Sequence, residues 1–68
     1  MRIIGAMETP DGRWRVEVVA RGGGRREYQI RHDGVLIEYL AIASVQRILG
    51  EAGVDMADLV EVPVQGAA

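Results

Sequence analysis

The chain has 68 residues, no cysteine and one histidine, and its formal net charge is −2. A chain of this length has room for one small core, so we expect a single domain over residues 1–64 and a frayed tail over residues 65–68. The composition excludes disulfides and thiolate metal sites, and one histidine is too few for a structural zinc site.

Residues 1–7 are apolar enough to predict a short first strand, although Gly5 weakens it. The sequence TPDG at positions 9–12 then predicts a tight turn. Proline presets φ for the second turn position, and glycine accepts the left-handed conformation that closes the loop. We therefore expect a hairpin between the first and second strands.

The second predicted strand, residues 13–21, alternates at the two-residue period of a pleated strand. Its alternate positions from Trp14 to Ala20 are apolar and predict the core face, while the intervening residues are mainly charged and predict a solvated face. Gly22-Gly23-Gly24 follows. Three glycines cost entropy to order, so this tip is expected to be mobile.

Residues 26–32 predict a third strand, and Asp33-Gly34 is a strong signal for a two-residue hairpin turn. The turn fixes the expected register: Ile30 opposes Ile37 and Tyr28 opposes Tyr39, all on the core face. The outward face is then mostly polar, but three aliphatic residues interrupt it: Val19, Leu36 and Leu40.

After Tyr39 the apolar period changes to that of a helix, with Val45, Ile48, Leu49 and Ala52 on one stripe. The helix begins either at Ser44 as N-cap or earlier at Ala41, and Gly53 is placed to end it. Asp55 predicts the cap of a further single turn, and Pro63 keeps the valine-rich segment after it at a sheet edge.

The predicted fold class is α+β, a four-stranded antiparallel meander with one C-terminal α-helix packed on one face. This order of elements is similar to that of a family of coactivators that bind single-stranded DNA, and no sequence motif of that family occurs in the chain.

All basic residues are arginines, and their distribution is uneven: between Gly12 and His32 six arginines stand against two glutamates, whereas the C-terminal half is acidic. The candidate contacts to nucleic acid or another anion are Arg13, Arg15, Arg21, Arg25, Arg26 and Arg31. Against this stand the pI of 5.2 and the expected core location of every aromatic ring. The alternative is a solvated face on which these arginines form cross-strand ion pairs with Glu17, Glu27 and Glu38.

No residue pattern predicts a catalytic, cofactor or metal site. His32 is expected to be a structural residue at the hairpin end beside Asp33, and the triple glycine matches neither the phosphate-loop nor the dinucleotide-binding pattern. We therefore expect a protein without enzymatic activity, cofactor or bound metal.

The leading hypothesis is a cytoplasmic, self-associating protein–protein interaction module, a homodimer that covers Val19, Leu36 and Leu40 by packing two sheets or by pairing edge strands. The longest apolar run is too short to cross a membrane, and the N-terminus lacks the apolar core of a signal peptide. The competing hypothesis is nucleic-acid binding by the arginine-rich sheet face and the hairpin over residues 21–26.

Overall fold

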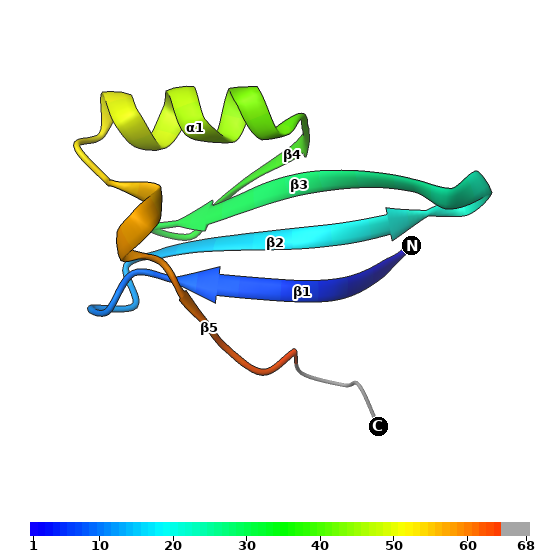
Figure 1. The fold of residues 1–68 in the computed structure, drawn as a ribbon, viewed down its shortest axis with the longest axis horizontal. Coiled ribbons are helices and arrows are strands. Elements are labelled where there is room, and N and C mark those ends of the chain that lie inside the picture. The colour runs from blue at the N-terminus through cyan, green and yellow to red at the C-terminus, as the bar shows by residue number, and fades with distance from the viewer. Residues whose placement is uncertain (65–68) are drawn as a thin grey trace.

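The computed structural model describes residues 1–64 and shows an antiparallel five-stranded sheet with one α-helix along one face (Figure 1). The order of the strands across the sheet is β4-β3-β2-β1-β5. The elements in chain order are β1 (Arg2–Glu8), β2 (Trp14–Arg21), β3 (Arg25–His32), β4 (Val35–Leu40), α1 (Ile42–Glu51) and β5 (Val60–Glu61), with short 3-10 turns at Gly22–Gly24 and Met56–Asp58. The α+β class and the meander of the first four strands are confirmed.

The prediction of four strands is wrong by one, because the chain returns after α1 and adds β5 to the free edge of β1. Met7 lies opposite Glu61, Glu8 lies opposite Val60, and the Val62 N–H donates to the Ala6 carbonyl at 3.0 Å. A strand of two residues is too short to show an alternating pattern, so the sequence indicated only an extended segment at an edge.

The core lies between α1 and the centre of the sheet, on the face that we call the helix face. Val16 of β2 and Ile30 of β3 pack there against Val45 and Leu49 of α1, and all four side chains are fully buried. Alternation puts Trp14, Val16, Val18 and Ala20 on one face of β2, as predicted, and the stripe of α1 supplies the opposing layer.

The helix begins earlier than one of the two predicted starts. Its N-cap is Ala41, whose carbonyl accepts from Ser44 and Val45, so the prediction of Ser44 as N-cap is wrong and the earlier start is right. At the other end, Gly53 has φ 77°, as predicted for the residue that terminates the helix.

The turn between β3 and β4 sets the register of that hairpin only in part. The two-residue turn that the sequence predicted is present, and it is of type I′, since Asp33 and Gly34 both have positive φ, 51° and 76°. Ile30 lies opposite Ile37 as expected, but a bulge follows and Tyr28 then lies opposite Leu40 instead of Tyr39. The extra residue in β4 exchanges the faces of Tyr39 and Leu40.

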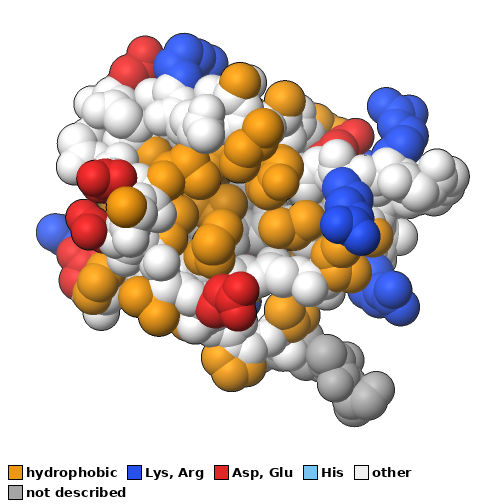
Figure 2. Space-filling view, in the orientation of Figure 1, with side chains coloured by type: hydrophobic (Ala, Val, Ile, Leu, Met, Phe, Trp, Pro, Cys, Tyr) orange, Lys and Arg blue, Asp and Glu red, His pale blue; other side chains and the backbone are white. Residues whose placement is uncertain are grey.

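The space-filling view shows hydrophobic side chains gathered across the middle of the visible face, between α1 and the strands below it (Figure 2). Arginine side chains stand at the end of the molecule that carries the Gly22–Gly24 turn. Within residues 1–64, no helix is long and apolar enough to cross a membrane.

Candidate functional site

The sheet face opposite α1, which we call the open face, carries a network of ion pairs. It is formed by alternate residues of β2 and by their cross-strand neighbours on β1, β3 and β4. The described salt bridges on this face join Arg15 to Glu8 and Glu17, Arg31 to Glu17, and Arg21 to Glu27 and Glu38. The predicted alternative, cross-strand pairing of arginines with glutamates, is therefore confirmed for three of the six arginines.

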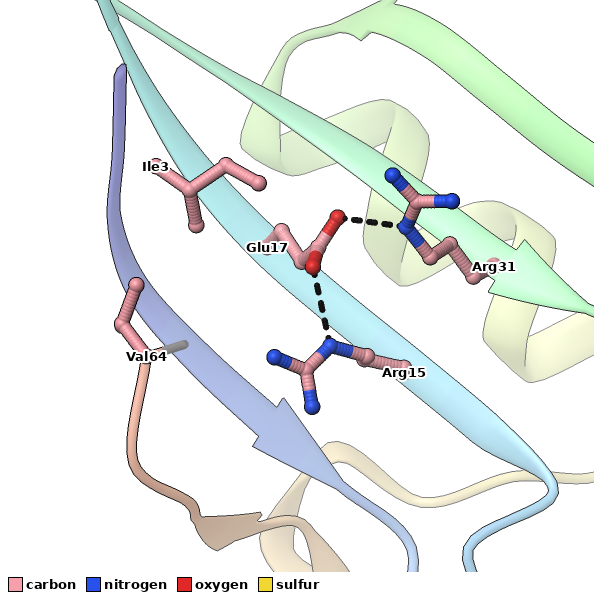
Figure 3. Close-up of a pocket in the computed structure, with 5 residues that line it drawn as sticks. All are labelled: Ile3, Arg15, Glu17, Arg31 and Val64. Carbon is pink, nitrogen blue, oxygen red and sulfur yellow. Dashed lines mark hydrogen bonds and ion pairs between the residues drawn. The ribbon is translucent and has the colours of Figure 1, made fainter. Parts of the chain in front are cut away.

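Glu17 is the centre of this network, and its side chain is buried although it is charged. One carboxylate oxygen accepts from Arg15 Nε at 2.9 Å, and the other accepts from Gln29 Nε2 at 2.6 Å and Arg31 Nε at 2.8 Å. Figure 3 shows Arg15 of β2 and Arg31 of β3 directed at the carboxylate from different sides. Together with Ile3 and Val64 these residues line a hollow of about 340 Å³.

The protonation of Glu17 follows from these contacts. Burial alone would raise the pKa of its carboxyl group, but the hydrogen bonds donated by Arg15, Gln29 and Arg31 outweigh burial, and the pKa lies below its usual value. The same contacts raise the pKa of Arg15, with the hydrogen bonds to Glu17 and Glu8 as the main causes. A carboxylate held ionised by three donors has no proton to give as a general acid, and its lowered pKa makes it a weak base, so the geometry supports a structural role.

Arg21 forms a second, smaller group at the β4 side of the open face. Its Nε donates to Glu27 at 2.6 Å, its Nη2 lies 3.9 Å from Glu38, and its guanidinium carbon lies 4.3 Å from the centroid of the Tyr39 ring. An arginine over an aromatic face is a cation–π contact, and it holds the ring in a defined position. The sequence prediction that Tyr39 belongs to the core is wrong, because the bulge turns this ring to the open face.

The other three candidate arginines, Arg13, Arg25 and Arg26, form no ion pair with any residue that the structure describes, and all are exposed. Sequence reasoning missed a further one, Arg2, which the register of β1 places in the same cross-strand row as Ala20 and Arg26. Arg25 lies opposite Arg21 at the same end of the sheet. We call Arg2, Arg25 and Arg26 the basic end. The signal for Arg2 was the length of the first strand, which brings residue 2 level with residue 20.

Two of the three residues predicted to mediate self-association are not exposed for contact. Val19 is on the open face but fully buried, between its cross-strand partners Ile3 and Glu27. Leu40 packs against the core on the helix face, since the bulge reverses its direction. Leu36 alone remains a surface residue, 39% exposed, so the three do not form one apolar patch.

The strand β4 is the most exposed apolar segment among the described strands. Its residues project to both faces at the edge of the sheet, and Leu40 is the one among them that packs against the core. The exposed fractions are 58% for Val35, 39% for Leu36, 36% for Ile37 and 69% for Tyr39. Because β4 pairs only with β3, the backbone groups on its other side have no partner strand among residues 1–64.

His32 is a structural residue in this arrangement. Its ring stacks on Trp14 with centroids 3.6 Å apart, its Nδ1 lies 2.8 Å from the Arg13 carbonyl, and its Nε2 lies 3.2 Å from Asp33. These contacts join the end of the β3–β4 hairpin to the start of β2. Nowhere in residues 1–64 do three His, Asp or Glu side chains group in a way that would hold a metal ion.

Comparison with known proteins adds no relative: no family model, curated protein or solved structure matches the chain.

Proposed function

We propose that the chain is a small, self-associating protein–protein interaction module without enzymatic activity, and that two copies pair through their β4 strands. The observation that supports this is the exposed edge of β4, where Val35, Leu36 and Ile37 form a regular strand with unpaired backbone on one side. Edge strands of this kind pair readily with another strand unless charge, proline or a covering element prevents it. Glu38 is the only charge within β4.

The geometry of the turn indicates which backbone groups are free. In a two-residue hairpin the residues that flank the turn, His32 and Val35, exchange hydrogen bonds, and the pattern alternates along an antiparallel pair. The N–H and C=O of Leu36 therefore face away from β3. Antiparallel pairing about a two-fold axis at Leu36 joins these groups to the same groups of a second copy and sets Val35 opposite Ile37 of that copy.

Such pairing also covers apolar surface. A two-fold axis perpendicular to the sheet leaves both copies of α1 on the same side of the joined sheet. Val35 and Ile37 then lie on the face of the joined sheet that carries both helices. Ile42, 41% exposed, is a further apolar residue at the start of α1. A domain of this size gains stability when such surface is removed from water.

The test is the molar mass in solution by light scattering, for the wild type and for Leu36→Pro. Proline removes the outward N–H of residue 36 but no hydrogen bond to β3, so the monomer fold is expected to survive. We expect twice the chain mass for the wild type and the mass of one chain for the variant. Ile4→Pro is the matched control: Ile4 is 37% exposed at the register shift of β1, and it is remote from β4. A wild type that is monomeric at high concentration, or a dimer that Leu36→Pro leaves intact, would contradict the proposal.

A second function, binding of nucleic acid, is supported by a different observation. The basic end gathers three arginines that have no ion-pair partner among residues 1–64, whereas Arg15, Arg21 and Arg31 are engaged with glutamates. Uncompensated arginines bind phosphates, and the affinity falls as salt displaces them. The proposed surface for nucleic acid is therefore the basic end of the sheet, in place of the whole arginine-bearing face that the sequence suggested.

A further inference from the structure

The bulge in β4 places an aromatic ring where the nucleic-acid hypothesis lacked one. Glu38 and Tyr39 together stand opposite Gln29, and Tyr39 has the positive φ of 61°. This conformation is uncommon for a bulky residue and persists only where the surroundings impose it. Its consequence is that the Tyr39 side chain leaves the core face and lies 69% exposed on the open face.

The ring is held in a defined position in spite of its exposure. Arg21 lies over it at 4.3 Å and is itself held by Glu27 at 2.6 Å. The side chain of Arg21 is only 22% exposed, so the cation is part of the sheet surface and lies against the ring. A positioned aromatic ring with most of its surface in solvent is the kind of platform on which an unpaired base stacks.

Uncompensated positive charge lies at the same end of the sheet as this platform. Arg25 is directly opposite Arg21 on the neighbouring strand, and Arg26 follows it on the other face of β3. Neither forms an ion pair with the described residues, and the Gly22–Gly24 turn next to them has no side chain to obstruct a ligand. The carboxylates near the ring, Glu27 and Glu38, already face Arg21.

We propose that Tyr39, Arg25 and Arg26 form a binding site for single-stranded nucleic acid, in which one base stacks on Tyr39, Arg25 contacts a phosphate on the open face, and Arg26 contacts the next phosphate where the strand passes round the end of the sheet. A single strand fits better than a duplex because a ring lying on a sheet surface reaches a base only when that base is unpaired. The inference rests on nucleic-acid binding as the second proposed function. It is independent of self-association, which uses the backbone of Leu36.

The experiment measures binding of a fluorescently labelled oligothymidylate of about ten nucleotides by anisotropy, over a range of salt concentrations. Two phosphate contacts predict that log K falls with log salt with a slope of about −1.4, and that Arg25→Ala with Arg26→Ala removes this slope. Arg47→Ala is the control, since Arg47 lies on α1, is paired with Glu51 and is not part of the site.

The ring is tested by Tyr39→Gly and Tyr39→Phe. Loss of one stacked base predicts binding about 5- to 150-fold weaker for the glycine variant, and Tyr39→Phe is expected to bind like the wild type. Glycine adopts φ 61° without strain, so the urea midpoint of Tyr39→Gly is not expected to fall far enough to explain a loss of binding by unfolding. An oligonucleotide of the same length without bases is expected to bind the wild type and Tyr39→Gly equally.

The outcomes separate the stacking site at Tyr39 from nucleic-acid binding in general. Salt-dependent binding that Tyr39→Gly leaves unchanged would refute the stacking site while nucleic-acid binding stands. No binding at low salt would refute both. Competition by polyglutamate as strong as by oligothymidylate would identify a general anion surface, and would also refute base stacking.

Discussion

Glu17→Ala is the substitution that most directly tests the ion-pair network of the open face. Glu17 is 3% exposed and accepts hydrogen bonds from Arg15, Gln29 and Arg31 at 2.6–2.9 Å. Removing one partner of a buried ion pair costs about 3–5 kcal/mol, since the remaining charges lose their compensation. A domain of this length has a free energy of unfolding of about 3–10 kcal/mol, so the variant should be at best marginally folded.

The measurement is urea unfolding followed by the fluorescence of Trp14, whose ring stacks on His32 and packs against the core. Glu51→Ala is the matched control. It removes a glutamate that pairs with Arg47 at 3.7 Å, but both side chains are largely exposed, so the expected loss is at most about 0.5 kcal/mol. A loss of less than about 1 kcal/mol for Glu17→Ala would refute the view that the network holds the open face together.

Glu17→Gln separates the loss of charge from the loss of the side chain. The amide oxygen can replace the carboxylate oxygen that accepts from Gln29 and Arg31, but the amide nitrogen then meets Arg15 Nε, donor against donor. We expect a loss of about 1.5–3 kcal/mol, between the values for wild type and Glu17→Ala. Equal losses for the two variants would show that the charge alone carries the effect.

Two further predictions use the same unfolding assay. The pKa of Glu17 is lower in the folded chain than its usual 4.5, so the stabilisation by its ionised form is present above about pH 4.5 and is lost as the pH falls through the folded value. The free energy of unfolding of Glu17→Gln should therefore change less than that of the wild type over that range. Equal acid sensitivity of the two would contradict a lowered pKa for Glu17. Gly53→Ala should cost about 1 kcal/mol of unfolding free energy: an added Cβ meets no other atom, so the cost is that of the positive φ of 77°. Gly50→Ala in the helix, with equally open space, should stabilise the fold by about 0.5–1 kcal/mol. Changes of the same sign for the two variants would contradict the assignment of Gly53 as the helix terminator.

The sequence predicted the β3–β4 hairpin as far as its turn could determine it. Asp33-Gly34 fixes a type I′ turn, and the register holds through Ile37 because each pair follows from the one before. Nothing in the residues marks the bulge, since Tyr39 is neither glycine nor asparagine. A physical reason exists: the added residue brings Leu40 to the core and exposes Tyr39, which can stack on Arg21.

The burial of Val19 and Glu17 was not predictable from alternation. Alternation identifies the face of the sheet on which a side chain lies, and it placed Val19 and Glu17 correctly on the face opposite the helix. It does not show how far the long side chains of neighbouring strands extend. Here Arg15 reaches Glu8 on β1, Arg21 reaches Glu27 on β3, and Arg31 reaches Glu17 on β2. The cross-strand ion pairs could be predicted as a type, but their geometry could not.

The two edges of the sheet differ in a way that supports the proposed pairing through β4. At the β1 edge, β5 adds only two residues, and Pro63 follows directly beyond Val62, where it has no N–H to offer another strand. At the opposite edge, β4 presents three consecutive aliphatic residues with no proline. This difference supports the proposal that a second copy pairs at the β4 edge. The central strand β2 lies between α1 on one face and the ion pairs on the other, and in the proposed dimer it supports that edge through β3.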